Sequence, residues 1–504
     1  MNANTKSRGH LGAAASFTSV CVAALAACGG SASDRGTTPV VAAAHRVDPP
    51  AAARHDAFVQ SASPDDAPAL PNLLPALNDS GFATTFSLAG AIDRSGPFFQ
   101  SLGSNGRSCA TCHAPSDGWT ITPGSVQARF ALSAGTDPIF RINDGSNTPN
   151  SDVSTLRARR AAYSMLLTKA VIRVGIGIPD GAEFELAQAD DPYGYASNRE
   201  LSLFRRPLPT TNLKFLSAVM WDGRETFKDA TSPSCVAGTT NCYASIHLDL
   251  ANQSNDATVG HAQAAQALTA EQREAIVAFE SALFTAQAFD WRAGVLSTDG
   301  ARGGPVALSQ TDFYFGINDT LVGDYRTQAP FTPSVMTLFD GWARAGAARA
   351  AIARGEALFN GKPIRIRHVK GLNDDLGVDE IAGTCTTCHN TPNAGDHSIP
   401  MPLDIGIADV ARRTPDMPLY TLRHKVTGET LQTTDPGRAL ITGKWKDIGR
   451  FKGPILRALA ARAPYFHNGM AGDLAAVVDF YDSRFGIGFT ANEKLDLIAF
   501  LRAL

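Results

Sequence analysis

The chain has 504 residues, of which 44% are hydrophobic and 18% are charged, a composition typical of a globular protein with buried cores. This length suggests about two to four domains. The formal net charge is −3 and no long basic run is present, so nucleic acid is not expected as a partner.

The first 27 residues are predicted to be an export signal. A basic start with Lys6 and Arg8 precedes residues 11–27, which are small and apolar but too short and Ala-rich for a membrane span. The ending Leu-Ala-Ala-Cys28 resembles the processing box of bacterial lipoproteins, which implies cleavage before Cys28 and a lipid on its thiol. The alternative is a plain secretory signal with an incidental Cys. The sequence therefore predicts a periplasmic protein anchored in the outer or inner membrane.

Residues 28–80 are rich in Ala, Ser, Pro, Asp and Gly and show neither a helical nor a strand period. Such a composition is typical of a flexible tether, which here would join the anchor to the folded body.

Two Cys-x-x-Cys-His motifs predict covalently bound haem c. The motifs are Cys109-Ala-Thr-Cys112-His113 and Cys385-Thr-Thr-Cys388-His389. In such motifs the thiols add to the haem vinyl groups and the adjacent His binds iron, here His113 and His389. The alternatives are a four-Cys zinc site built from both pairs and a thioredoxin-like redox pair. Neither alternative needs a His directly after each pair, so the sequence predicts two haem c groups.

A second pair of cysteines, Cys235 and Cys242, lies in a segment rich in Ser, Thr, Gly and Asn. In an oxidising compartment this pair is predicted to form a disulfide, the alternative being two free thiols.

An internal repeat predicts two related helices, at 269–283 and 490–504. Each opens with a capping box, Thr269 with Gln272 and Thr490 with Glu493. Each then carries an apolar helical stripe, made of Ile276, Phe279 and Leu283 in the first and Leu497, Phe500 and Leu504 in the second. The alternative is two unrelated amphipathic helices. Because each follows a Cys-x-x-Cys-His motif, we interpret them as closing helices of two duplicated cytochrome c domains.

A helix at 347–359 is predicted to open the second domain, ending at Asn360-Gly361 in the manner of a C-cap. The predicted fold is therefore mainly α-helical, with two cytochrome c-type haem domains at residues 81–345 and 346–504. The first would carry a large irregular insertion and a connector at 286–345.

Three further segments resemble the bacterial di-haem cytochrome c peroxidase superfamily. This superfamily includes the di-haem enzyme that matures the tryptophan-derived quinone of methylamine dehydrogenase. The segments are Met220-Trp221-Asp222-Gly223-Arg224, Phe451-Lys-Gly-Pro-Ile-Leu-Arg457 and Ala463-Pro-Tyr-Phe-His467-Asn-Gly469. With the two haem motifs they cover most of residues 95–504 in scattered blocks. The resemblance implies redox catalysis on hydrogen peroxide or dioxygen, with electrons from a periplasmic donor protein.

The resemblance also implies roles around the second haem. Trp221 would lie between the haems and help electrons pass, the alternative being a buried core Trp, and Arg457 would contact the cofactor. The family's axial ligand stands fourteen residues after the motif His, which here leads from His467 to Tyr481. Tyr481 shares a helical stripe with Leu474, Val477 and Val478, and Tyr is a known ligand of haem iron. Alternatives are a core Tyr bonded to a haem propionate, or His467 or Met470 as the ligand.

The first haem is expected to be the reactive one. Peroxidases of the family commonly have a distal His soon after the first motif, but no His occurs here from 114 to 246. Gln253 could match the family's distal Gln, and His261 lies close to the position of its acid–base Glu. The repeat agrees, since His261 stands eight residues before Thr269 and Tyr481 nine before Thr490. His261 is an axial ligand, an acid–base group or a surface His.

Three other functions remain open from the sequence. An electron carrier would have both irons six-coordinate, a dioxygenase would resemble the di-haem rubber oxygenases, and a maturation enzyme would act on a partner protein. The family's inter-haem calcium site has no matched ligand, because Arg206 stands close to where its Asn should be.

Overall fold

The fold mixes helices with many short strands. A computed structural model describes residues 68–226 and 246–504, together with the backbone of 234–235 and 242–243. Over this part of the chain, helix accounts for 32% and strand for 18% of the structure, in eleven α-helices and six small sheets. The prediction of a mainly α fold is therefore wrong. The predicted signal peptide, Cys28 and the start of the tether lie outside the described residues.

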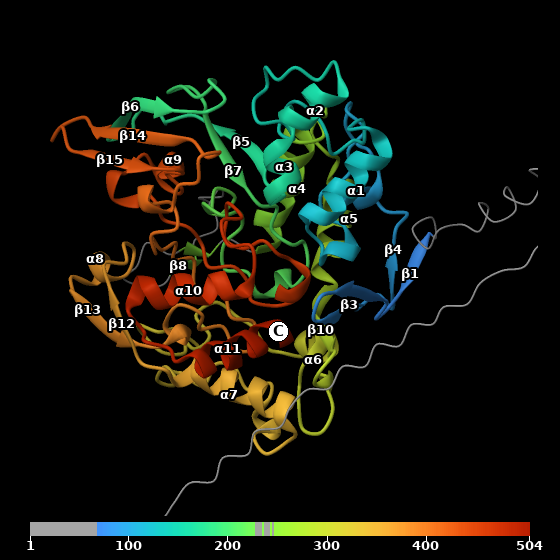
Figure 1. The fold of residues 1–504 in the computed structure, drawn as a ribbon, viewed down its shortest axis with the longest axis vertical. Helices are drawn as coiled ribbons and strands as arrows, with labels where there is room; N and C mark the ends of the chain where they lie inside the picture. The colour runs from blue at the N-terminus through green and yellow to red at the C-terminus, as the bar shows by residue number, and fades with distance from the viewer. Residues whose placement is uncertain (1–67, 227–233, 236–241, 244–245) are drawn as a thin grey trace, which may run out of the picture. The chain divides into compact units, whose positions relative to one another are not determined.

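The helices occur in both halves of the chain (Figure 1). They are α1 (Pro123–Ser133), α2 (Leu156–Ala162), α3 (Ser164–Lys169), α4 (Ile246–Gly260), α5 (Ala270–Ser281), α6 (Gly304–Ser309), α7 (Ala347–Gly361), α8 (Asn373–Leu376), α9 (Ala439–Thr442), α10 (Leu474–Phe485) and α11 (Ala491–Ala503). None of the described helices is both long and apolar enough to cross a bilayer.

The two predicted closing helices are confirmed as α5 and α11. In each, the first-turn Thr accepts a hydrogen bond from the backbone N–H three residues on, 3.2 Å from Gln272 to Thr269 and 3.2 Å from Glu493 to Thr490. Both capping boxes are complete, which satisfies backbone donors that a helix otherwise leaves free. The predicted opening helix is confirmed as α7.

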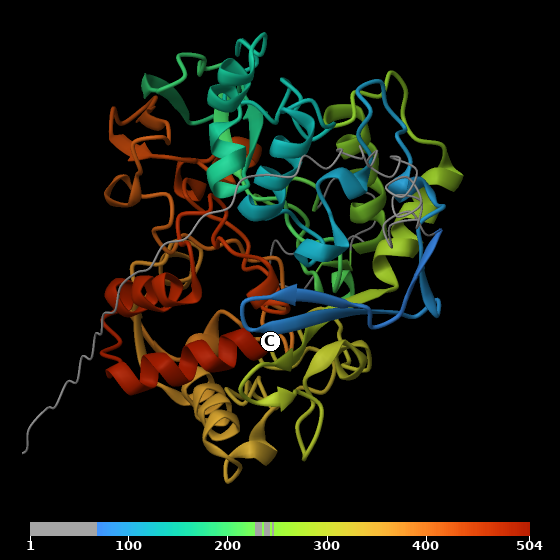
Figure 2. The same ribbon diagram turned by 45° about the vertical axis from the view of Figure 1, so that its right-hand side comes forward.

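Helix α7 packs closely on α11. A Cβ on Gly355 of α7 would lie 2.0 Å from the backbone oxygen of Asp496 of α11, so only glycine permits this approach. Around this crossing, Phe339, Trp342 and Phe500 are fully buried and form the centre of the largest core cluster. In Figures 1 and 2, α7, α10 and α11 gather in the same part of the molecule.

The strands pair antiparallel in six sheets. These are β1 (Ala69–Pro71) with β4 (Ala91–Asp93); β11 (Gly294–Val295), β10 (Leu283–Asp290), β3 (Gly81–Ser87) and β2 (Pro75–Asn78); β5 (Ile172–Ile176) with β7 (Leu201–Arg205); β15 (Thr430–Thr433), β14 (Leu419–His424) and β6 (Phe184–Asp190); β12 (Ile364–Arg367) with β13 (Glu380–Gly383); and β8 (Ser234–Cys235) with β9 (Cys242–Tyr243).

Long-range strand pairing explains why the fold prediction failed. Leu283 was placed on the stripe of the first closing helix, but α5 ends at Ser281 and Leu283 begins β10, opposite Ser87 of β3. Tertiary pairing with a strand about 200 residues away overrides the local helical pattern, as strand formation depends on partners more than on propensity. Residues 69–78, predicted as the end of the tether, likewise form β1 and β2.

The predicted insertion also makes sheet structure. Strand β6 lies in the first half of the chain, yet it pairs with β14 of the second half over Phe184–Asp190. All described elements fall in one compact unit. The division into domains at residue 345 stays a prediction. The sheet of β6 and β14 joins the two predicted domains, 81–345 and 346–504.

The two cysteines predicted to form a disulfide face each other in backbone register. Cys235 of β8 pairs with Cys242 of β9. Directly opposite residues in antiparallel strands have Cα atoms about 4.5–5.5 Å apart, within the range that a disulfide spans. Their side chains lie outside the described residues, so the disulfide stays a prediction.

Candidate active site

Each Cys-x-x-Cys-His motif forms the same local structure. The motif cysteines begin a short 3-10 turn, Cys109–Thr111 and Cys385–Thr387, capped by the preceding residue. The backbone N–H of the motif His then donates to the carbonyl of the first Cys, at 3.0 Å for His113 and 3.1 Å for His389. This turn places two thiols and an imidazole on one side of the chain.

The imidazole orientation is also the same at both motifs. His113 Nδ1 lies 3.2 Å from the carbonyl oxygen of Trp119, and His389 Nδ1 lies 2.6 Å from that of Gly395, in each case six residues on. A carbonyl can only accept, so Nδ1 carries the proton and Nε2 keeps its lone pair. Burial lowers the pKa of His113 to about 4, which keeps the ring neutral. A neutral imidazole oriented through Nδ1 is how metal-binding His is usually held.

Each motif lines a cavity of its own. The first cavity has about 1480 Å³ of empty volume and the second about 1450 Å³. The four motif cysteines are free rather than disulfide-bonded, and burial raises the pKa of Cys109, Cys385 and Cys388 to about 12. Because the pairs lie in separate cavities, one four-Cys zinc site does not fit, and within the described residues no cluster of three or more potential metal ligands occurs. Neutral buried thiols also argue against a reactive redox pair.

Trp221 lies between the two cavities and lines both of them. Its indole Nε1 donates to the carbonyl oxygen of Arg206 at 2.8 Å. Its ring stands edge-on to His467, with centroids 6.3 Å apart. Lys452 and Pro454, from the Phe-Lys-Gly-Pro block, also line both cavities, a position that the sequence analysis did not assign to them.

A buried ion-pair network anchors the segment that carries Trp221. Arg205 donates to Asp222 at 2.5 Å and to the two oxygens of Asp435 at 2.7 and 2.9 Å. Burial by itself would raise the pKa of Asp222, but the guanidinium groups of Arg205 and Arg224 outweigh it and bring the value to about 2. The network therefore ties the neighbour of Trp221 to strand β7 and to the loop before α9.

One face of α4, continued by His261 directly after the helix, forms a wall of the first cavity. Gln253, Ala257 and His261 are spaced four residues apart and all line it, together with His113. The ring of His261 is partly exposed and is close enough to His113 to lower the pKa of His113 electrostatically. The predicted residues His261 and Gln253 thus share a cavity with the first motif.

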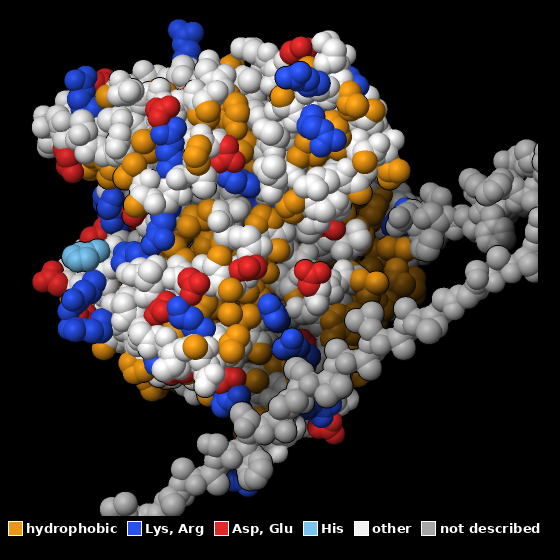
Figure 3. Space-filling model, viewed as in Figure 1, with side chains coloured by type: hydrophobic (Ala, Val, Ile, Leu, Met, Phe, Trp, Pro, Cys, Tyr) orange, Lys and Arg blue, Asp and Glu red, His pale blue; other side chains and the backbone are white. Residues whose placement is uncertain are grey.

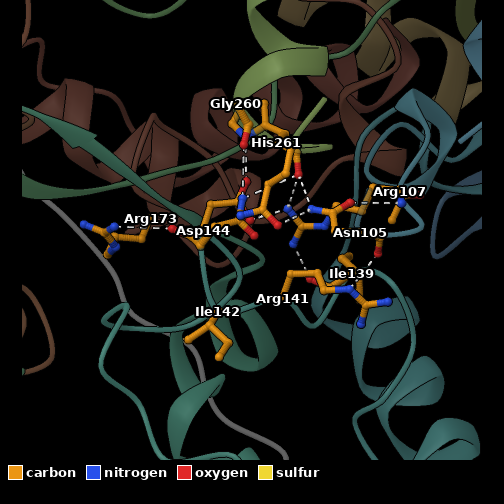
Figure 4. A network of polar contacts seen from close by, with 12 residues as sticks. Asn105, Arg107, Ile139, Arg141, Ile142, Asp144, Arg173, Gly260 and His261 are labelled. Atoms are coloured by element: carbon orange, nitrogen blue, oxygen red, sulfur yellow. Dashed lines mark hydrogen bonds and ion pairs between the residues drawn. The ribbon is translucent and has the colours of Figure 1, made fainter. Parts of the chain in front are cut away.

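A residue that the sequence analysis missed contacts His261. The Nδ1 atom of His261 lies 2.5 Å from Oδ2 of Asp144, whose other oxygen is ion-paired with the buried Arg107 (Figure 4). Nothing in the local sequence marks Asp144, which lies in the loop between α1 and α2.

In the second cavity, two of the three candidate axial ligands line the wall. Tyr481 of α10 and His467 are present there, whereas Met470 is not among the lining residues. Burial, followed by the nearby Cys388 and Cys385, raises the pKa of Tyr481, so the phenol lies near the motif thiols.

His467 is fully buried and stacks on Phe451 with centroids 4.2 Å apart. Within the described residues neither of its ring nitrogens has a hydrogen-bond partner. A buried polar atom left unpaired costs about 1–3 kcal/mol, so a polar or metal-bearing group in this cavity would relieve the loss. The residues present therefore fit a haem c in each cavity.

Arg457 lies away from both cavities, whereas Arg206 lines the first one. Arg457 is buried but does not line either cavity: its guanidinium donates to the backbone oxygens of Leu504 at 3.1 Å and Asn393 at 2.8 Å, which ties the C-terminus to the loop after the second motif. Arg206 donates to the carbonyls of Ala170 and Arg462.

Comparisons with known proteins find similarity to cytochrome-c peroxidases over part of the chain. No family model matches the chain. It is 36% identical over 171 residues to the cytochrome-c peroxidase IdrP1 of Pseudomonas sp. (strain SCT), covering 30% of this chain and 39% of that protein. It is 32% identical over 189 residues to the cytochrome-c peroxidase IdrP1 of Denitromonas iodatirespirans, covering 33% of this chain and 44% of that protein. Over these segments this chain is similar to bacterial cytochrome-c peroxidases.

The resemblance to the di-haem cytochrome c peroxidase superfamily is thereby confirmed. The chain spans less than half the length of these curated proteins that it matches. Among solved structures it is similar to a MauG-like protein associated with microbial copper homeostasis, at 16% identity over 81% of this chain and 85% of that one. The TM-score of that match is 0.35, too low to support an argument about the fold.

Proposed function

We propose that this chain is a periplasmic oxidoreductase that reduces hydrogen peroxide in the first cavity and carries a haem c at each Cys-x-x-Cys-His motif. The proposal is carried by one observation: His261, hydrogen-bonded to Asp144, lines the same cavity as His113 of the first motif. In this proposal His113 is the iron ligand and His261 is the acid–base group, and both line one cavity.

The two motif thiols would attach a haem, and Nε2 of His113 or His389 would bind its iron, which would supply redox chemistry at each motif. His261 Nε2 accepts a proton from peroxide and returns it to the departing oxygen as the oxygen–oxygen bond breaks. The amide of Gln253, on the same face of α4, orients the peroxide by hydrogen bonding. Two electrons from a periplasmic donor protein and two protons convert one peroxide into two waters.

Trp221 lines both cavities and is the proposed relay for electrons between them. Tyr481, which lines the second cavity, would be a ligand of the iron of a haem held there. A phenolate is an anionic ligand that favours ferric iron, so this haem would store and pass electrons rather than bind peroxide.

The face seen in Figure 3 intersperses basic and acidic side chains, without a continuous basic surface.

The export signal and the Leu-Ala-Ala-Cys28 box support the proposed periplasmic location and lipid anchor.

His261→Ala tests the function. The rate of peroxide reduction should fall by about 10²–10⁴-fold, the loss typical of an acid–base group, while both haems stay attached. His247→Ala is a matched control, because His247 lies on α4, the helix that His261 directly follows, but is exposed and paired with Glu274, outside the cavity. If His261→Ala instead converts the first haem from low to high spin and speeds the reaction, His261 is an axial ligand.

A protein that reacts with dioxygen but not peroxide would favour a dioxygenase resembling the rubber oxygenases.

A further inference from the structure

The contacts of His261 form a closed network with the loop that leads into the first motif. Asp144 lies between His261 and Arg107, and the three side chains point toward one another in Figure 4. The Asp144 side chain is 7% exposed and that of Arg107 is 2% exposed. Burial would raise the pKa of Asp144, but its bonds to His261 and Arg107 lower it below its usual value. The carboxylate is therefore ionised.

We propose that Asp144 is the positioning residue of His261: it holds the Nδ1–H tautomer and so turns the bare Nε2 atom into the first cavity. An ionised carboxylate can only accept hydrogen bonds, so the 2.5 Å contact requires the proton to sit on Nδ1. The remaining ring nitrogen, Nε2, then carries the lone pair that a base needs. This inference rests on the proposed peroxide reaction and adds the residue that sets its base.

The network also holds the backbone of His261. Its carbonyl oxygen accepts from Asn105 Nδ2 at 2.8 Å and from Arg107 Nη1 at 3.3 Å. The ring is thus fixed to Asp144 in the loop between α1 and α2, and the peptide is fixed to the loop that leads into the first motif. A side chain restrained at two points loses little further entropy when it reacts, which is the physical advantage of such preorganisation.

That loop is the one that carries the haem attachment site. Arg107 stands two residues before Cys109, and its remaining nitrogens donate to the carbonyls of Pro138 at 2.8 Å and Ile139 at 2.6 Å. Asp144 is in turn anchored by its own carbonyl, which accepts from the Arg173 N–H at 2.7 Å. The distance between the base and the attached haem is therefore set within one connected unit, although Asp144 and His261 are 117 residues apart in sequence.

Asp144→Asn is the sharpest test. The amide can donate to Nδ1, which would move the proton to Nε2 and remove the base while changing the shape little. Peroxide reduction should fall by about 10²–10⁴-fold, since a wrong His tautomer costs about as much as loss of an acid–base group. Asp144→Glu should recover part of the rate, because a carboxylate is kept.

A double-mutant cycle separates positioning from a purely structural role. In a His261→Ala background, Asp144→Asn should change the rate by less than about twofold, because the residue acts through His261. An equal loss in both backgrounds would overturn the proposal, as would an unchanged rate in the single variant.

Ligand binding provides a readout besides peroxidase activity. Hydrogen cyanide must lose its proton to a base as it binds haem, whereas carbon monoxide has none to lose. Asp144→Asn should slow cyanide binding at neutral pH by at least about tenfold and leave carbon monoxide binding to the reduced protein unchanged. If both ligands bind as in the wild type, the proposal fails. If the wild-type protein does not reduce peroxide but Asp144→Asn still slows cyanide alone, the positioning role holds and the proposed function is the part that fails.

Discussion

Replacing Asp222 by Asn tests whether the buried ion-pair network holds the segment that carries Trp221. The Asp222 side chain is 0% exposed and contacts Arg205, whose side chain is 3% exposed. The substitution keeps the shape and removes the charge. Arg205 would then keep only Asp435 as its anionic partner.

The size of the effect follows from the electrostatics. The pKa of Asp222 falls from its usual 3.8 to about 2 in the folded protein. A fall of this size contributes about 2.5 kcal/mol to the free energy of unfolding at neutral pH. Breaking a buried ion pair costs about 3–5 kcal/mol, and because Arg205 retains Asp435 we expect a loss of about 3 kcal/mol.

The pH dependence has a definite sign. Because folding lowers the pKa of Asp222, the carboxylate stabilises the protein fully above pH 3.8 and stops doing so as the pH falls through about 2. The difference in unfolding free energy between wild type and Asp222→Asn should therefore be full at pH 6 and about half as large at pH 3.

Urea-induced unfolding of the holoprotein, followed by circular dichroism, measures both quantities. Asp299→Asn is the control, because Asp299 also pairs with an arginine, Arg349, but at an exposed site where the variant should unfold like the wild type. A loss below about 1 kcal/mol for Asp222→Asn, the size typical of exposed pairs, would refute the reasoning. So would an identical loss at pH 6 and pH 3.

Three further predictions concern the cofactors and the anchor. Mass spectrometry of the denatured protein should find two covalent haem additions, and Cys385→Ala should disrupt attachment at the second motif alone; a single addition in the wild type would contradict this. Tyr481→Phe should change the spin state of the second haem in electron paramagnetic resonance and raise its reduction potential, and if only His467→Ala does so, the ligand is His467. Cys28→Ser should release the protein from membranes on fractionation, and unchanged fractionation would exclude the lipid anchor.

The local structure of the haem motifs could be predicted from the sequence because it depends on neighbours in the chain. Cysteines, His and capping residues stand within a few positions of one another, and the resulting turns are the same at Cys109 and Cys385. The capping boxes of α5 and α11 were likewise readable, since a helix start is a local hydrogen-bonding event. The position of Trp221 between two cavities agrees with what the resemblance implied.

Other features depended on partners far away in the chain. Leu283 continues a helical stripe in sequence but becomes a strand because β3 offers backbone partners about 200 residues away. Arg457 lies in a segment that resembles the peroxidase superfamily and was expected to contact the cofactor. In the folded chain its guanidinium instead donates to the backbone oxygen of Leu504.

The sequence by itself determined which residues bind the cofactors, in our proposal, and where the repeated helices begin. Only the tertiary structure decided how the first cavity is completed. Asp144 has no motif around it, and it meets His261 only because the loop after α1 folds back onto the end of α4. A hydrogen bond between distant residues has no local period or spacing, so the partner that orients the proposed base could not be found without the fold.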